Sequence, residues 1–251
     1  RVVQYMKFSK PGGARSSLQR FGLLRWPGPA PGFPRVELVY ADLAFDRFCQ
    51  RWLDAEIDRT WVEEIRAKTQ SFQECWDEEA PRLLGTAVRE VGAPFRNRDA
   101  TAVLTLCPIP SMSVPLLINV RRFLEGPTQG HPQPMFLFCA LVFHELLHTY
   151  IGRYDRLESK LVEKYSGEPL VVLTHLPLMA LMKRVYLERG RGDQLREIVA
   201  RDSAAEDAAY RRAWQIVDDI EGQEVFVSEL KSAQLGRLEA VQPLAAPAQR
   251  R

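Results

Sequence analysis

Three residues that could bind a metal ion or act in catalysis lie within about one turn of a predicted helix. His144, Glu145 and His148 form the pattern H-E-x-x-H in the string FHELLHTY. On a helix this spacing places all three side chains on one face. Two neutral imidazoles one turn apart can bind a single Zn²⁺ ion, and the carboxylate beside them can take a proton from a metal-bound water. The spacing therefore predicts hydrolytic chemistry at a zinc ion.

The helix that carries this pattern is unusually apolar. The run from Met135 to Phe143 is the longest uninterrupted apolar stretch of the chain, and the segment from Met135 to Tyr150 has few polar residues besides the motif. Such a helix must be buried on nearly all sides. Because an ionisable group buried without a partner costs several kcal/mol, a bound metal ion is a physical reason for the motif to lie here.

With HELLH at residues 144–148, the chain resembles the zincin metallopeptidases. The resemblance implies His144 and His148 as zinc ligands, Glu145 as the general base and a peptide or protein as the substrate. In zincins an edge strand before the motif helix pairs with extended substrate, a part that residues 115–120 or 101–107 would take here. The metzincin pattern is absent, because Ile151 stands in the place of its glycine and Tyr154 in the place of its third histidine.

The third zinc ligand is open between two residues. His175 lies in the apolar string VVLTHLPLMALM, where an imidazole needs a partner that a metal would supply. Glu168 lies twenty residues beyond His148, as a ligand of the gluzincin type would. Either His175 is the ligand and Glu168 orients an imidazole, or Glu168 is the ligand and His175 stabilises the oxyanion. Further candidates for the third ligand are Asp155, Glu158 and Glu163.

Zincins also use a tyrosine or histidine that hydrogen-bonds the tetrahedral intermediate. Nothing in the sequence ranks the nearby residues of these types, which are His131, Tyr150, Tyr154 and Tyr165.

The hydrophobic patterning predicts an α+β fold, a predominantly helical single domain with a small β-sheet and a zincin-like active-site helix. Strands are expected at 36–40, 101–107 and 115–120, and Pro81 is expected to open a new helix. Residues 1–34 form an irregular arm rich in proline and glycine, residues 35–240 the zincin-like metallohydrolase domain, and residues 241–251 a disordered tail.

Composition narrows the class of protein. The 251 residues hold 34 Lys and Arg against 32 Asp and Glu, a net charge of +2 that gives no reason to expect nucleic-acid binding. No apolar run reaches the roughly 18 residues of a membrane span, so a soluble chain is expected. The four cysteines form no C-x-x-C pair and are interpreted as ordinary buried thiols. The chain begins at Arg1, as a processed or trimmed product would, and its compartment stays open.

The leading hypothesis is therefore a zinc-dependent metallopeptidase in which Glu145 activates the zinc-bound water. The alternatives are a non-catalytic, metal-stabilised pseudoenzyme or binding domain, and a zinc hydrolase of a non-peptide bond. An open coordination position beside a cleft would distinguish an enzyme from a structural site closed by four protein ligands.

Overall fold

The structure is a computed structural model, and it describes residues 32–41, 45–125, 131–152, 157, 159–204 and 208–241. Almost all of the arm expected at 1–34 and of the tail expected at 241–251 falls outside these ranges, as do Tyr154, Asp155 and Glu158. Within them the fold is α+β with helices predominating and one four-stranded sheet, which confirms the predicted fold class.

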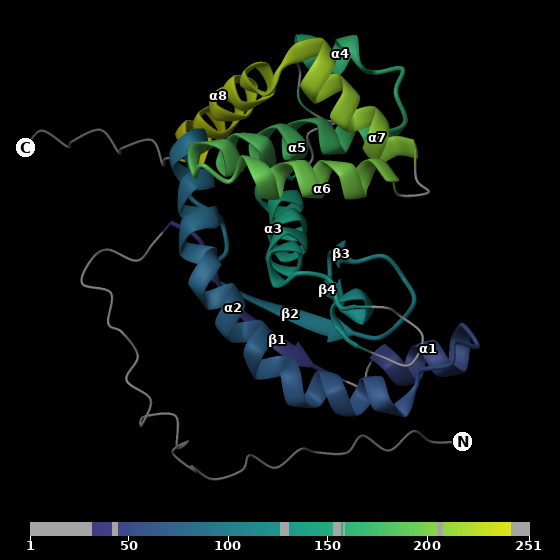
Figure 1. The fold of residues 1–251 in the computed structure, drawn as a ribbon. Coiled ribbons are helices and arrows are strands. Elements are labelled where there is room, and N and C mark those ends of the chain that lie inside the picture. Colours follow the sequence, from purple (N-terminus) through teal and green to yellow (C-terminus); the bar gives the residue numbers. More distant parts are fainter. Residues whose placement is uncertain are drawn as a thin grey trace, which may run out of the picture. The chain divides into compact units, whose positions relative to one another are not determined.

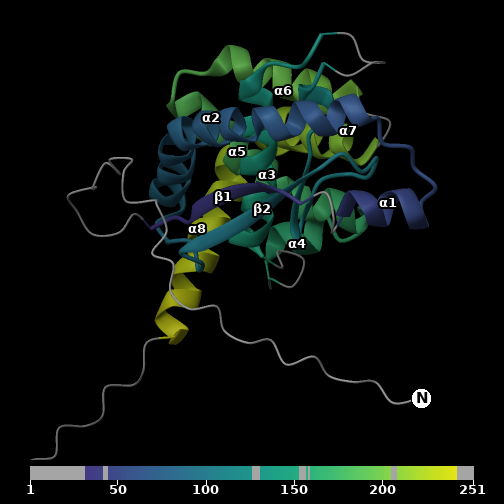
Figure 2. The same cartoon turned by 90° about the horizontal axis from the view of Figure 1, so that it is seen from below.

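The sheet has the strand order β1-β2-β4-β3. Strands β1 (Arg35–Tyr40), β2 (Asp99–Thr105) and β4 (Leu116–Asn119) run parallel, and the short β3 (Met112–Ser113) pairs antiparallel with β4. Figure 2 shows β1 and β2 side by side. A parallel pair needs a crossover connection, which helices α1 and α2 provide between β1 and β2.

The two strands expected to form a substrate-binding edge are interior strands instead. β2 is flanked by β1 and β4, and β4 by β2 and β3, so the expectation for residues 101–107 and 115–120 is wrong. Their apolar runs are those of strands buried within a sheet, which sequence pattern alone does not distinguish from an edge. The edge strands are β1 and β3.

Helix α2 (Arg59–Val91) packs against β1 and covers its free edge. The Gln73 side chain accepts a hydrogen bond from the Leu38 amide at 2.7 Å and donates one to the Val36 carbonyl at 3.0 Å. Asp58 caps the helix by accepting from the Thr60 amide at 2.6 Å, and Gly92 ends it with a left-handed φ of 79°.

The expectation that Pro81 opens a new helix is wrong, because Pro81 lies inside α2. An interior proline costs a helix about 3 kcal/mol. The helix continues through it because its buried face is unbroken on both sides, and each large apolar side chain on that face contributes about 1.5–3 kcal/mol on burial. The buried residues around the proline are Trp76, Ala80, Leu83 and Leu84.

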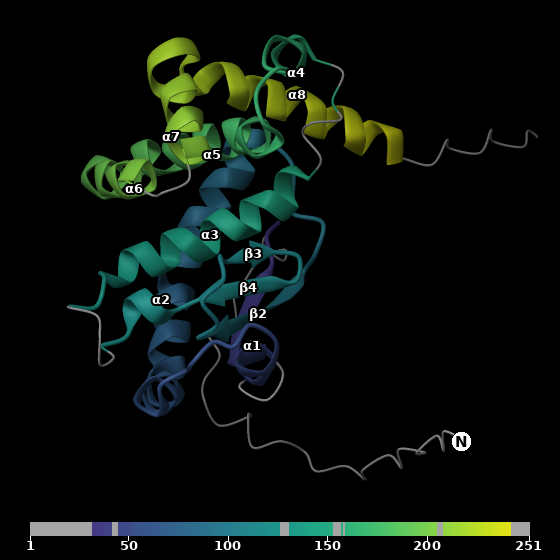
Figure 3. The same cartoon turned by 90° about the vertical axis from the view of Figure 1, so that its right-hand side faces the viewer.

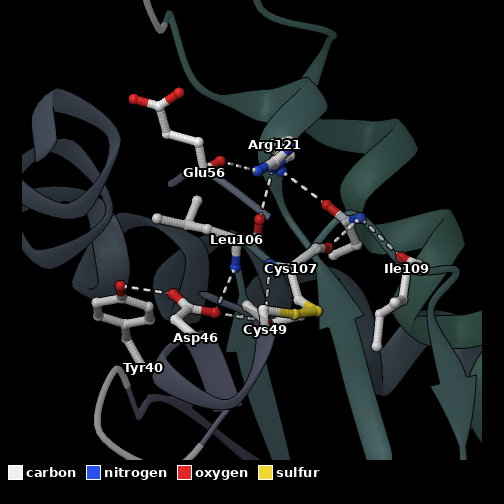
Figure 4. The surroundings of a disulfide bond; sticks show 10 residues. Tyr40, Asp46, Cys49, Glu56, Leu106, Cys107, Ile109 and Arg121 are labelled. Atoms are coloured by element: carbon white, nitrogen blue, oxygen red, sulfur yellow. Dashed lines mark hydrogen bonds between the residues drawn. A yellow bond between two sulfur atoms is a disulfide. The ribbon is translucent and has the colours of Figure 1, made fainter. Parts of the chain in front are cut away.

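A disulfide joins Cys49, in helix α1 (Arg47–Trp52), to Cys107 just after β2 (Figure 4). The interpretation of all four cysteines as ordinary buried thiols is therefore wrong for this pair. It holds for Cys139, which is free and buried, while Cys75 is free but only half-buried. Beside the disulfide, the buried Asp46 carboxylate accepts hydrogen bonds from the Thr105 hydroxyl at 2.6 Å and the Leu106 amide at 3.0 Å. The disulfide and these hydrogen bonds thus fix the start of α1 to the end of β2. The spacing of the cysteines in the sequence did not indicate this disulfide.

Helix α3 (Met135–Ile151) packs on β3 and β4 (Figure 3) and also contacts α2, α5 and α6. Twelve of its residues are buried, as its apolar sequence predicts. A short 3₁₀ turn, η3 (Arg121–Phe123), precedes it, and α4 (Lys160–Lys164) follows it.

Helix α5 (Leu170–Glu188) is the centre of the helical layer (Figure 1). It contacts α2, α3 and the C-terminal elements. These elements are α6 (Gly192–Ala204), α7 (Ala208–Gln215), the π-helical η5 (Ile216–Glu221) and α8 (Gln223–Val241). By length and composition α5 could span a membrane, but 67% of its most apolar window is buried within the fold.

Candidate metal centre

The α3–α5 contact brings three imidazoles together. The ring centroids of His144 and His148 on α3 are 5.0 Å apart, and the ring of His175 on α5 lies 5.2 Å from the first and 4.7 Å from the second. One ligand nitrogen from each ring falls within 4.8 Å of the other two. Three nitrogen donors this close together could hold one metal ion, as the histidine ligands of zinc sites do.

His144 is held in the form that binds a metal. It is buried, and its Nε2 atom has no hydrogen-bond partner in the described part of the chain. Burial, together with the charges of His175 and His148, holds its pKa well below the usual range. The pKa of His148 is lowered to about 4, first by burial and then by His175. Both imidazoles are therefore neutral at pH 7, which leaves a lone pair on each ring for a cation.

The orientation of His175 is fixed by its own helix. Its Nδ1 atom lies 2.6 Å from the Val171 carbonyl oxygen, one turn earlier on α5. A carbonyl only accepts hydrogen bonds, so Nδ1 carries a proton, and in the neutral ring Nε2 then carries the lone pair. A hydrogen bond of this kind is how metal-binding histidines are commonly held in one tautomer.

Glu145 follows His144 on α3 and lies in a different environment. Its side chain is 5% exposed and lines a pocket of about 150 Å³ that His144 also lines. Burial raises the pKa of this carboxyl to about 7. A carboxyl with this pKa can both accept and release a proton near neutral pH, as a general acid–base group must.

The pocket lies between α3 and the C-terminal helices. Leu137, Ala140 and Leu141 of α3 form an apolar part of its wall. Pro110 and Ser111, which immediately precede the edge strand β3, line it as well. The pocket therefore joins the metal-binding face of α3 to an edge of the sheet.

Glu168 is engaged elsewhere. Its Oε1 atom accepts hydrogen bonds from Nε and Nη2 of Arg212 at 2.9 and 2.6 Å. The cluster of potential metal ligands consists of the three histidines and does not include Glu168. Glu163 is exposed on α4, and Asp155 and Glu158 lie outside the described ranges. Of the two leading candidates for a third ligand, the structure brings His175 to the motif.

Sequence reasoning missed Tyr210. This residue of α7 lines the pocket, and its ring lies 5.9 Å from that of His144 and 4.6 Å from that of His175. Two arginines follow it in the string YRRAW and suggest a solvated face, but Tyr210, Ala213, Trp214 and Val217 recur at helical spacing, and the last three are buried. This periodicity could have placed Tyr210 on the inward side of the helix.

The aromatic and histidine candidates named earlier take other positions. The Tyr150 hydroxyl donates to the Ala93 carbonyl at 2.6 Å, and the Tyr165 hydroxyl donates to Glu221. His131 is exposed before α3 and is not among the residues that line the pocket. Tyr154 is outside the described residues.

Comparisons with protein-family models, curated proteins and solved structures return no significant match. The chemistry of the site is therefore argued from its own residues. Three imidazoles suit zinc and also copper, iron or nickel. The buried Nε2 of His144, which has no hydrogen-bond partner among the described residues, and the fixed tautomer of His175 both fit a metal ion bound at this point.

Proposed function

We propose that this protein is a zinc-dependent metallopeptidase of the zincin type. The observation that supports this most is the convergence of three imidazoles from two helices beside Glu145, a carboxyl whose pKa burial raises to about 7. His144, His148 and His175 hold the ion in this proposal, and Glu168 does not.

A Zn²⁺ ion at this position would lower the pKa of a bound water toward about 7 and polarise a substrate carbonyl. Glu145 accepts the proton of the attacking water and passes it to the leaving amine. Because neutral imidazole ligands carry no negative charge, they would not reduce the positive charge of the bound ion. The apolar part of the pocket wall lowers the local polarity, which strengthens electrostatic interactions at the reacting bond.

Tyr210 is the group we assign to the oxyanion of the tetrahedral intermediate. Its ring contacts those of His144 and His175, and it lines the same pocket as Glu145. A phenol hydroxyl there would donate a hydrogen bond to the oxygen on which negative charge develops.

A structural metal site is the main alternative, and one observation argues against it. Structural zinc is closed by four protein ligands. In the described ranges the cluster offers three, and a pocket adjoins one of them. Three protein ligands beside a cavity are the arrangement typical of catalytic zinc. A zinc hydrolase of a non-peptide bond uses the same residues and differs only in its substrate.

The test is cleavage of a mixed peptide library by the zinc-loaded protein, read by mass spectrometry. The matched control is zinc-loaded Glu145→Gln, which keeps the size of the side chain and removes the base. We expect cleavage by the wild-type protein and a loss of about 100-fold or more in the variant. Equal cleavage by both proteins, or none by a wild-type protein that holds one zinc ion, would overturn the proposal.

A further inference from the structure

The pocket beside Glu145 contains two arginines that the proposed reaction does not use. Arg122 comes from η3, before α3, and Arg201 comes from the last turn of α6. The Arg201 guanidinium lies over the Phe123 ring at 5.8 Å, which places it beside the residue that follows Arg122. Two elements far apart in the sequence thus bring two cations to one side of the pocket.

Neither guanidinium forms an ion pair or a side-chain hydrogen bond within the described ranges. This differs from Arg184, Arg189 and Arg212, each of which pairs with a glutamate. Burial lowers the pKa of Arg201, and the like charge of Arg122 lowers it further, while Asp202 and Glu197 act in the opposite direction. The two arginines are therefore close enough to repel each other, a cost that a bound anion would remove.

Asp202, the acidic neighbour of Arg201 on α6, is only a partial counter-charge. Its Oδ2 atom accepts a hydrogen bond from Trp214 Nε1 at 2.9 Å. Burial raises its pKa to about 6, so at pH 7 it carries one negative charge against two positive ones. Glu197 is exposed and does not line the pocket. Among the described residues that line the pocket, the two arginines are the cationic groups and Asp202 and Glu145 are the acidic ones, so the arginines are the groups that would attract a carboxylate.

The exposure of the two arginines suits capture of a group from outside. Arg122 is exposed and Arg201 half-buried, whereas Glu145 in the same pocket is buried, so the pocket reaches the surface at the arginines. The aromatic ring under Arg201 restricts the planar guanidinium. Such a guanidinium presents two parallel N–H donors, which match the two oxygens of a carboxylate.

We propose that Arg122 and Arg201 bind a carboxylate of the substrate and so select peptides with a negative charge next to the cleaved bond. The identification of this ligand as part of a substrate rests on the proposed function. The carboxylate is either the free C-terminus of a peptide or an acidic side chain. The first source would make the protein a carboxypeptidase, and the second an endopeptidase with acidic specificity.

The test measures binding rather than cleavage, by fluorescence anisotropy with three labelled tetrapeptides. The first has neutral side chains and a free C-terminal carboxylate, the second is its C-terminal amide, and the third is an amide with one glutamate in the last position. They are titrated into the metal-free wild-type protein and into zinc-loaded Glu145→Gln, which does not turn them over. We expect at least one of the two carboxylate peptides to bind about tenfold or more tightly than the neutral amide in both proteins. Preference for the first peptide identifies the C-terminus, and preference for the third identifies the side chain.

Variants connect the preference to the two arginines. Arg122→Gln and Arg201→Gln should each lose most of it, and Arg201→Lys, which keeps the charge without the planar fork, should lose part of it. The control is Arg59→Gln, an exposed arginine of α2 that pairs with Glu63 and does not line the pocket. It should leave the preference unchanged, and thermal melts of all variants check that they fold.

Three results would overturn the inference. The first is equal affinity for the charged and neutral peptides. The second is no detectable binding of any peptide at about 1 mM, the dissociation constant of a weak ligand. The third is a preference that persists in the Arg122→Gln/Arg201→Gln double variant. The metal-free wild-type protein is one of the two proteins titrated. If the protein never bound zinc, the proposed function would be wrong, but the peptide titration would still test the role of the two arginines.

Discussion

The imidazoles of His148 and His175 meet edge to face, with ring centroids 4.7 Å apart and an interplanar angle of 83°. They belong to different helices, and no fixed sequence spacing relates them. Their meeting depends on the packing of α3 against α5, two helices in which most residues are buried. Loss of this helix contact would separate the third imidazole from the motif.

The first prediction concerns the third ligand. His175→Gln should weaken zinc binding by at least about 100-fold, because one of three nitrogen donors is lost. Glu168→Gln should leave zinc affinity unchanged and only weaken the contact with Arg212. Competition with a chromophoric chelator measures both affinities. The opposite ranking of the two variants would assign the ligand to Glu168.

A second prediction follows from the pKa values of the site. At pH 6 most of Glu145 is protonated, since its pKa is about 7, whereas His148, with a pKa of about 4, is already neutral. The charge of a bound Zn²⁺ ion lowers the pKa of Glu145, so binding at pH 6 should release about one proton. The part of this release that comes from Glu145 should fade above pH 7, where Glu145 is ionised before zinc binds. Zinc affinity should accordingly rise with pH up to about 7.

Calorimetric titrations in two buffers with different ionisation enthalpies count the protons released. Glu145→Gln is the control and should release almost none at pH 6. If this variant released as many protons as the wild-type protein, the histidines would be their source. The neutral state described for the imidazoles would then be wrong.

Tyr210 gives a third prediction. Tyr210→Phe keeps the ring that contacts His144 and His175 and removes only the hydroxyl. If the hydroxyl stabilises the oxyanion, kcat should fall by about 100-fold while KM and zinc affinity change little. Steady-state kinetics on a peptide found in the library screen measures the split. A rise in KM with unchanged kcat would show that Tyr210 serves binding instead.

The disulfide gives a fourth prediction. Cys49 and Cys107 are separated by 58 residues, and opening a loop of this size should lower the free energy of unfolding by about 4 kcal/mol in the chain-entropy model. A reducing agent should therefore shift the urea midpoint of the wild-type protein downward. In the Cys49→Ser/Cys107→Ser double variant the same agent should have no effect. If the reducing agent left the urea midpoint of the wild-type protein unchanged, the disulfide would not stabilise the fold.

The local parts of the site could be predicted from the sequence, and the parts that depend on packing could not. The H-E-x-x-H spacing places His144, Glu145 and His148 on one face of any helix, and the apolar surroundings of His175 indicate that it needs a partner. Neither observation decides whether His175 or Glu168 is the third ligand, because the position of each residue depends on how α5 packs against α3. In the fold, Glu168 pairs with Arg212 and is not part of the histidine cluster, and nothing in the sequence relates Glu168 to Arg212.

The errors have the same origin. Pro81 was expected to start a helix because local propensity disfavours an interior proline, and the buried face around it outweighs that preference. Residues 101–107 and 115–120 were recognised as strands, but an edge position is a property of the whole sheet. The Cys49–Cys107 pair likewise depends on where β2 ends relative to α1.

The most direct test of the central claim is zinc K-edge X-ray absorption on the protein loaded with one equivalent of zinc. We predict scattering from three imidazoles at about 2.0–2.1 Å with one further oxygen, and two imidazoles in His175→Gln. A sulfur shell at about 2.3 Å, or a spectrum that His175→Gln leaves unchanged, would contradict a three-histidine site with an open position.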